Sequence, residues 1–305
     1  MGSDPVARTT PAKLARELAE LDEPFEASAS TVRRLLDLLD IRLYRNMKSL
    51  SGPYHPDRER QFQHLNRIKL RFLEEDLPVV SADAKKKELV GAFKQDGRTW
   101  GTAPRLVNDH DFPHLAQCKA TPYGIYDVGA NRGYVRVGIS ADTSAFAVGS
   151  LRWWWSRYGC RRCRGAEELL LLVDGGGSNG YRLWMWKLLL QQELADRYGL
   201  AATVCHYPTG ASKWNPSEHR LLGPISKNWA GEPLTSLDRM LGLIRGTGRN
   251  GKGTLRVEAA LDLATYEKGL KAPPGAAARL NLERHAVCPN WNYTIRPRVA
   301  GWNAN

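Results

Sequence analysis

Three acidic residues stand at places in the sequence where carboxylates could bind metal ions. Asp83 follows one short apolar run, Asp174 follows another, and Glu218 lies in the first turn of an expected helix. Phosphodiester cleavage with two Mg²⁺ ions needs several carboxylates that converge on metals roughly 3.5–4 Å apart. One ion activates the attacking oxygen, and the other stabilises the leaving oxygen. These three acids are therefore candidate catalytic and metal-binding residues.

Each acid also has a purely structural interpretation. Asp83 could form an ion pair with one of the lysines 85–87, and Asp174 could accept backbone N–H bonds from the glycine turn 175–180. Asn215-Pro-Ser-Glu218 has the pattern of a helix start, with Asn as the cap and Glu at the third position. A helix start is also a fixed place from which to direct a carboxylate, so both roles stay open. The acids are too far apart for a local motif, and only the fold can bring them together.

Residues near these acids, and others in a basic loop, could contact a phosphate backbone. The glycines after Asp174 let such a chain approach closely, because they have no side chain and tolerate positive φ. The candidates for DNA contacts are Lys85, Lys86, Lys87, Asn179, Lys213, Arg249 and Lys252. Asn179 and Lys213 fit equally well as turn or surface residues. The string 246–253 looks like a GxGxxG or P-loop motif, but no Ser or Thr follows its lysine and a strand-like segment comes next, which favours a basic loop.

Other catalytic chemistries have little support in the sequence. The histidines have no HExxH or nucleophile-elbow context, so neither a zinc hydrolase nor a catalytic serine is indicated. The five cysteines, at 118, 160, 163, 205 and 288, are odd in number and scattered, which is typical of reduced thiols. Cys160 and Cys163 form a CxxC without a second pair at zinc-finger spacing, and we interpret them as ordinary thiols.

The overall charge favours an acidic partner. Lys and Arg number 44 against 32 Asp and Glu, which gives a formal charge of +12 and a pI near 9.6. Such a field attracts polyanions, so nucleic acid is the leading partner class, although charge can also serve solubility alone. The first thirty residues lack the apolar core of a signal peptide, and no apolar run approaches the length of a membrane span. We therefore expect a cytoplasmic location without a membrane partner.

Two short helical patterns precede the region of the acids. They run from Pro11 to Leu21 and from Ser28 to Leu39, with a turn between them. This arrangement resembles a helix-turn-helix, although a plain helical hairpin would give the same pattern. The residues that the second helix would present to DNA are Ser30, Thr31, Arg33 and Arg34. A further helix with an apolar stripe, His55 to Glu75, is expected to connect this segment to the next domain.

From Leu77 onward the pattern changes to strands that alternate with helices. Three strands, a helix to Tyr158, a buried strand at 169–173, a helix ended by Gly199, a strand and a last helix are expected. This order matches the ribonuclease H-like fold, a mixed α/β sheet flanked by helices. The three consecutive tryptophans 153–155 must point in different directions on their helix, so we expect at least one near the surface.

Five stretches of the sequence resemble the Rhodopirellula-type DDE transposases, an insertion-sequence family distantly similar to mariner-like transposases. They lie in order along nearly the whole chain, at 80–88 (VSADAKKKE), 122–127 (PYGIYD), 173–180 (VDGGGSNG), 209–220 (TGASKWNPSEHR) and 291–297 (WNYTIRP). The resemblance implies a ribonuclease H-like fold and matches Asp83, Asp174 and Glu218 to the two aspartates and the glutamate of the family. It also implies cleavage at transposon ends and strand transfer into target DNA, with two Mg²⁺ ions for which Mn²⁺ can substitute. Double-stranded DNA is then the partner, bound by a homodimer or a higher oligomer.

The expected organisation follows from these patterns. It comprises a helix-turn-helix-like segment (1–52), a connecting helix (53–76), a ribonuclease H-like catalytic domain (77–230) and a C-terminal extension packed on the core (231–305). Members of the family carry more helical sequence before the region that matches Pro11, so we expect this chain to be shortened at its N-terminus. Two other functions stay open: an inactive or repurposed DNA-binding protein derived from a transposase, and a nuclease that cuts without joining. The presence of all three acids favours the enzyme.

Overall fold

The computed structural model describes residues 10–21, 25–41, 55–208, 210–211 and 214–298, so Lys213 lies outside the described residues. The chain forms two compact units, Met1–Ser51 and Gly52–Asn305, and each is described by itself. Within the ranges given above, no helix is long and apolar enough to cross a membrane.

The first unit contains the two predicted helices, α1 (Pro11–Ala19) and α2 (Ala29–Leu38), which pack against each other. Both begin at a side-chain cap, because Thr10 accepts a hydrogen bond from the backbone N–H of Lys13 and Ser28 accepts one from that of Thr31. Val32 of α2 is buried between them. The helix pair that the sequence predicts is thus present.

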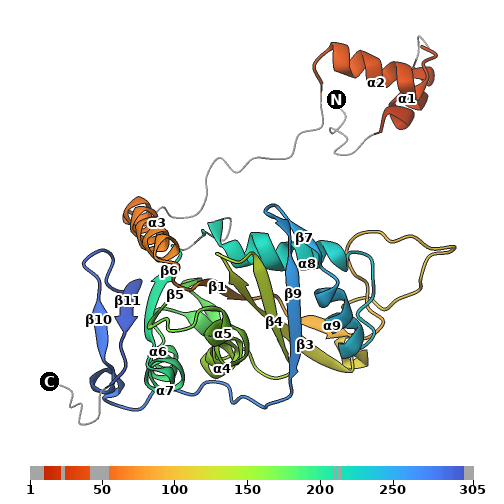
Figure 1. The fold of residues 1–305 in the computed structure, drawn as a ribbon. Helices are drawn as coiled ribbons and strands as arrows, with labels where there is room; N and C mark the ends of the chain where they lie inside the picture. Colours follow the sequence, from red (N-terminus) through yellow and green to blue (C-terminus); the bar gives the residue numbers. More distant parts are fainter. Residues whose placement is uncertain (1–9, 22–24, 42–54, 209, 212–213, 299–305) are drawn as a thin grey trace. The chain divides into compact units, whose positions relative to one another are not determined.

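A mixed sheet forms the centre of the second unit (Figure 1). Its strands are β1 (Val79–Ala84), β2 (Glu88–Val90), β3 (Cys118–Asp127), β4 (Arg132–Gly138), β5 (Glu168–Val173), β6 (Ala201–His206), β9 (Arg256–Asp262), β10 (Leu282–Arg284) and β11 (Asn292–Ile295). The order is β10-β11-β6-β5-β1-β3-β4-β9, and β2 pairs with β3. Strands β1, β5 and β6 are parallel, whereas β3 is antiparallel to β1 and to β4. The path β4-β3-β1-β5-β6 has the order and directions of a ribonuclease H-like fold, which confirms the predicted fold class.

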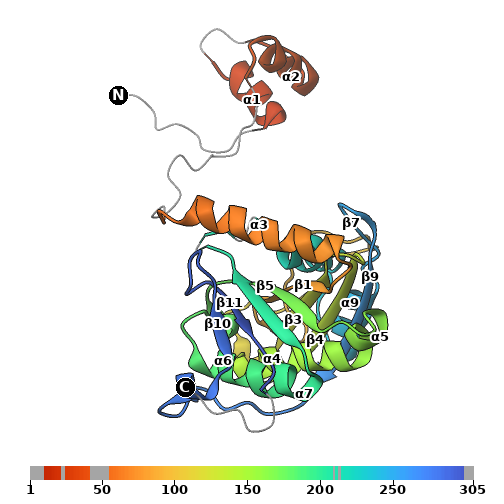
Figure 2. The same cartoon turned by 60° about the vertical axis from the view of Figure 1, so that its left-hand side comes forward.

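Helices cover both faces of this sheet (Figures 1 and 2). The helical elements are α3 (Arg58–Glu74), η1 (Pro113–Leu115), α4 (Ser144–Trp154), η2 (Trp155–Gly159), α5 (Cys160–Arg162), η3 (Gly177–Asn179), α6 (Trp184–Leu190), η4 (Gln191–Ala195), α7 (Asp196–Tyr198), η6 (Glu218–Leu222), α8 (Gly223–Asn228), α9 (Leu237–Arg245) and η7 (Ala276–Arg279). Helices α3, α8 and α9 pack on one face, and α4 and α6 pack on the other. Leu170 and Leu172 of β5 point into the first core, and Leu169 and Leu171 into the second. Burial on both faces explains the continuously apolar sequence of this strand.

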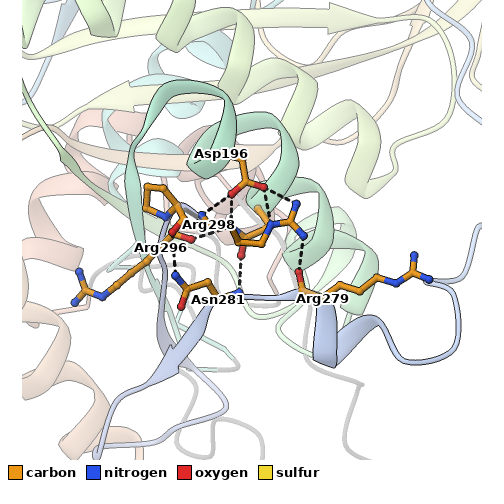
Figure 3. A network of polar contacts seen from close by, with 7 residues as sticks. Asp196, Arg279, Asn281, Arg296 and Arg298 are labelled. Atoms are coloured by element: carbon orange, nitrogen blue, oxygen red, sulfur yellow. Dashed lines mark hydrogen bonds and ion pairs between the residues drawn. The ribbon is translucent and has the colours of Figure 1, made fainter. Parts of the chain in front are cut away.

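The last part of the chain extends the sheet at both edges. Strand β9 runs parallel to β4 at one edge, and β11 pairs antiparallel with β6 near the other. Between α9 and β9, the basic string at 246–253 forms a small hairpin of β7 (Arg249–Asn250) and β8 (Gly253–Thr254). The guanidinium of Arg298 donates hydrogen bonds of 2.6 and 2.9 Å to Asp196 and a third to the carbonyl of Arg279 (Figure 3). This clasp fixes the segment after β11 against α7.

The three consecutive tryptophans are all buried, so the expectation that at least one lies near the surface is wrong. Trp153, Trp154 and Trp155 are 9%, 0% and 4% exposed. The helix changes from α to π geometry at Trp155–Gly159, and the wider turn alters the direction of the side chains. A Cβ atom on Gly159 would lie 2.6 Å from the Trp155 ring, so the absence of a side chain there leaves room for the indole.

Candidate active site

Two neighbouring parallel strands at the centre of the sheet carry the first two acids. Asp83 lies near the carboxyl end of β1, and Asp174 directly follows β5. Ala82 pairs with Val173 in the parallel register, so Asp83 and Asp174 occupy equivalent positions on the two strands. The carboxyl ends of parallel strands form the edge where ligands bind in open α/β sheets. The fold therefore brings together two acids that are far apart in the sequence.

Glu218 stands at the start of the helix that follows β6. Asn215 caps this helix, since its Oδ1 accepts a hydrogen bond of 3.2 Å from the backbone N–H of Ser217. The predicted cap is therefore present. The carboxylate of Glu218 forms no hydrogen bond or ion pair with any other residue of the described ranges. It is thus available to a ligand.

The acids influence one another electrostatically. The pKa of Asp83 is raised to about 7, first by burial and then by repulsion from Asp174, with Glu218 and Asp142 adding to it, while a hydrogen bond from the Ala84 N–H opposes the rise. The two other predicted acids and a further one, Asp142, therefore act on the carboxyl group of Asp83. A cation between them would remove this repulsion.

Hydrogen bonds fix the orientation of the two aspartates. Asp83 Oδ1 accepts a bond of 2.8 Å from the Ala84 N–H, and Asp83 Oδ2 accepts one of 3.1 Å from Asn215 Nδ2. Asp174 Oδ1 accepts a bond of 2.7 Å from the Gly175 N–H, so the interpretation based on the glycine turn also holds. Within the part of the chain that the structure describes, the second oxygen of Asp174 accepts no hydrogen bond and is open to a ligand.

The lysine closest in sequence does not neutralise Asp83. Lys85 Nζ lies 2.5 Å from Glu88 Oε1 and 4.9 Å from the centre of the Trp229 ring. This pairing, together with its partial burial, removes Lys85 from the exposed candidates for DNA contacts. Lys86 and Lys87 are exposed. The ion pair proposed between Lys85 and Asp83 is therefore wrong, because Glu88 provides a nearer acid within the same turn.

Asp142 is an acid that the sequence did not single out as functional. Thr143, not Asp142, caps α4, since its Oγ1 accepts a hydrogen bond from the Phe146 N–H. Asp142 Oδ1 is buried and has no hydrogen-bond partner within the described part of the chain. A buried carboxylate oxygen without a partner is unfavourable unless a ligand engages it. The sequence could have indicated this role, because Asp142 precedes Thr143, and Thr143 caps the helix without help from the Asp142 carboxylate.

The donor set fits a hard divalent cation. Carboxylate oxygens are the ligands that Mg²⁺ and Mn²⁺ prefer, and both the repulsion on Asp83 and the unpartnered oxygen of Asp142 would be relieved by one. Within the described ranges, no group of three His, Cys, Asp or Glu side chains is yet close enough to hold an ion. Asp83, Asp174 and Glu218 are the residues that could hold such an ion once their side chains converge on it.

A chain of buried hydrogen bonds supports the backbone of Asp174. Trp186 Nε1 donates to the Tyr293 hydroxyl at 2.9 Å, which leaves the hydroxyl proton to bond His206 Nε2 at 3.0 Å. His206 Nδ1–H then donates to the Asp174 carbonyl at 2.9 Å. Burial lowers the pKa of His206 to about 3, so its imidazole stays neutral. This network, which links β5, β6, α6 and β11, was not predicted from the sequence.

The other predicted DNA contacts have different surroundings. Asn179 is 2% exposed and accepts a hydrogen bond of 2.8 Å from the Tyr123 hydroxyl. It is therefore a buried turn residue and not the exposed phosphate contact that was predicted. Arg249 and Lys252 are exposed on the β7–β8 hairpin. In the first unit, Arg33 and Arg34 are exposed, and the hydroxyls of Ser30 and Thr31 each bond Ser28 Oγ.

Comparisons with known proteins identify a family for this architecture. Residues 6–297 match the family described as "Rhodopirellula transposase DDE domain". Among curated proteins, none matches the sequence.

Three similar solved structures carry related titles. The chain is similar to "Mos1 transposase paired-end complex with left transposon end" at 14% identity and a TM-score of 0.44, over 78% of this chain and 70% of that one. It is similar to "Crystal structure of the Mos1 mariner paired end complex with Mn" at 12% identity and a TM-score of 0.42, over 76% of this chain and 64% of that one. It is also similar to "Crystal structure of the mariner Mos1 paired end complex with Mg" at 16% identity and a TM-score of 0.43, over 78% of this chain and 70% of that one.

Proposed function

The chain belongs to the Rhodopirellula transposase DDE domain family, and on that premise we propose that it cleaves DNA at transposon ends and joins these ends to target DNA. The observation that carries the proposal is the placement of Asp83 and Asp174 at equivalent ends of neighbouring parallel strands, with Glu218 acting on Asp83. The assembly contains at least two copies on double-stranded DNA, because two ends must meet one target.

The mechanism consists of two in-line displacements. Two Mg²⁺ ions, or Mn²⁺, at Asp83, Asp174 and Glu218 would neutralise charge at the phosphate and activate the attacking oxygen. Water first attacks the phosphodiester at the transposon end, and the 3′-oxygen of the end leaves. The resulting 3′-hydroxyl then attacks a target phosphodiester, and the target's own 3′-oxygen leaves. The side chains stay unmodified, and the carboxylates of Asp83 and Asp174 would offer the ions oxygens that are already oriented by hydrogen bonds.

A basic groove next to Glu218 provides a path for the DNA backbone. It encloses about 550 Å³ between the helix η6–α8 and the β7–β8 hairpin. Its lining includes His219, Lys227 and Arg249 and, within the part of the chain that the structure describes, no acidic residue. Lys227 and Arg249 are exposed, and neither pairs with a described acid. Unpaired cations in a groove attract a polyanion.

Lys252, which follows the groove residue Gly251, lies near Lys69 of α3. The pKa of Lys69 is lowered by burial and then by the charge of Lys252, so these lysines of α3 and the hairpin lie near each other. Their repulsion is unfavourable in the free protein and would be relieved by a phosphate. Lys252 also donates a hydrogen bond of 3.3 Å to the Val128 carbonyl, which holds it beside the groove.

Removing the two exposed cations of the groove, together with Lys252 beside it, is expected to reduce the salt dependence of DNA binding. Log K falls with log salt concentration, and each phosphate contact contributes about 0.9 to the steepness of this fall. Lys227→Ala/Arg249→Ala/Lys252→Ala should therefore make the fall less steep by about 2 to 3. Fluorescence anisotropy with duplex DNA over a salt series measures this slope.

The matched control removes the same charge from an exposed segment elsewhere. Lys268→Ala/Lys271→Ala/Arg279→Ala changes three exposed cations between β9 and β10. Its slope should stay that of the wild type. Equal losses in both triple variants would mean that only net charge matters, and this would refute the groove.

The proposed function is tested by analysing reaction products. A donor plasmid that carries the gene with its native flanking DNA is incubated with the protein and Mg²⁺, and a second plasmid serves as target. Covalently joined donor and target DNA is the expected product, and Asp174→Asn is the control without activity. Cut but unjoined DNA would instead indicate a nuclease, and binding without cleavage would indicate a repurposed DNA-binding protein.

A further inference from the structure

One buried amide connects the strand of the first acid with the segment of the third. Asn215 is 1% exposed and lies three residues before Glu218. Its side chain reaches β1, where Ser81 and Asp83 point toward it. These contacts span more than 130 residues of sequence, so they form only when the two elements are packed in place.

The hydrogen bonds determine which way the amide points. Asn215 Oδ1 accepts from Ser81 Oγ at 2.7 Å, from Ser217 Oγ at 2.8 Å and from the Ser217 N–H at 3.2 Å. The Ser217 N–H can only donate, so the amide atom that it contacts is the oxygen, and both hydroxyls then donate to it as well. The amide nitrogen must therefore be the atom at 3.1 Å from Asp83 Oδ2. Ser81 Oγ in turn accepts from the Ser217 N–H at 3.1 Å, so the network is closed.

We propose that Asn215 is a positioning residue that presents the Asp83 carboxylate to the metal ions and ties it to the segment that carries Glu218. This inference rests on the proposed function. Among the described residues, each oxygen of Asp83 accepts one hydrogen bond, from Ala84 and from Asn215. A carboxylate oxygen has a second lone pair, and with the first one engaged the second has a fixed direction. Asn215 caps the helix with its amide oxygen and holds Asp83 with its amide nitrogen, so one side chain can serve both roles.

Loss of the amide should weaken metal binding more than it weakens the fold. Substituting residues that orient metal ligands typically reduces metal affinity about 10- to 100-fold. Asn215→Ala removes the donor to Asp83 and the acceptor for both serines. Ser81→Ala keeps the Asn215 donor to Asp83 but removes one of the hydrogen bonds that hold the Asn215 oxygen. We therefore expect a smaller loss of metal affinity, of about 3- to 10-fold.

The matched control is another buried amide far from the acids. Gln191 is fully buried and bonds Asp196 and the carbonyl of Arg296 near the C-terminal clasp. Gln191→Ala removes a comparable network and should reduce stability, but it should leave metal affinity within about twofold, since the effects of distant sites are independent.

The experiment measures Mn²⁺ binding to the full chain by electron paramagnetic resonance, with and without duplex DNA, and the Mg²⁺ concentration for half-maximal cleavage. We expect both to weaken at least tenfold in Asn215→Ala and less in Ser81→Ala, with DNA affinity unchanged and cleavage largely restored by excess Mg²⁺. An unchanged Mn²⁺ affinity in both variants, or an equal loss in Gln191→Ala, would overturn the inference. If Asn215→Ala does not fold, Ser81→Ala decides the question. Failure of the wild type to cleave would refute the proposed function, whereas Mn²⁺ binding would still decide the role of Asn215.

Discussion

Asp174→Asn is expected to lower the rate of DNA cleavage by about 10³-fold or more while the fold and DNA affinity stay unchanged. Asparagine has the size of aspartate and keeps an oxygen for the Gly175 N–H, which bonds Asp174 at 2.7 Å. It loses the negative charge that a divalent cation needs. Metal ions supply several kcal/mol of transition-state stabilisation, and a loss of about 4 kcal/mol corresponds to about three powers of ten in rate.

This prediction is checked by single-turnover cleavage at saturating Mg²⁺ together with thermal unfolding and DNA binding. Asp238→Asn makes the same chemical change at an exposed position in the first turn of α9 and should alter the rate less than about twofold, as surface substitutions usually do. Full cleavage activity in Asp174→Asn would exclude Asp174 from the catalytic centre.

Without metal ions, the free energy of unfolding of the wild type, relative to that of Asp83→Asn, is expected to fall as the pH rises from about 4 to about 7. The pKa of Asp83 is raised to about 7 in the folded protein, from 3.8 when unperturbed, chiefly because the carboxyl is buried and Asp174 repels its charge. The folded state therefore binds a proton that the unfolded state releases in this range. The stability that this proton provides is complete below pH 4 and is lost as the pH rises through 7, by up to about 1.4 kcal/mol per pH unit.

Mg²⁺ should reverse this trend, because it replaces the proton on Asp83. Its affinity is then expected to rise about tenfold per pH unit up to about pH 7 and to level off above it. Chemical denaturation and calorimetric titration between pH 4 and pH 8 measure both effects. Asp83→Asn is the reference, since it has no proton at residue 83 to release but keeps the other titrating groups, such as His206, whose lowered pKa makes stability rise over the same pH range. It should not show the Mg²⁺ stabilisation. A difference in stability between the wild type and Asp83→Asn that stays flat with pH would contradict the buried, repelled carboxyl.

The sequence predicted those features that depend on local patterns. Three local signals were sufficient to predict the ribonuclease H-like order of elements. They are the continuously apolar sequence of β5, the end of a helix at Gly199, and the alternation of strands and helices. The topology then placed Asp83 and Asp174 at neighbouring strand ends. These predictions succeeded because periodicity and termination signals lie within a few residues of each other.

Features that depend on distant partners were not predictable in this way. The second role of Asn215 requires Ser81 on β1, and the burial of three tryptophans requires a π turn and the missing side chain of Gly159. The burial of Asn179 of η3 likewise depends on Tyr123 of β3. In each case the local pattern was compatible with more than one environment, and packing between remote segments decided between them.

The most direct test of the central claim is a crystal structure of the full chain with duplex DNA and Mn²⁺, measured for anomalous scattering. We expect two peaks roughly 3.5–4 Å apart, bound by Asp83, Asp174 and Glu218 and in contact with a phosphate of the DNA. Anomalous peaks at other residues, with these three carboxylates unliganded although DNA is bound beside them, would contradict the assignment of the catalytic centre.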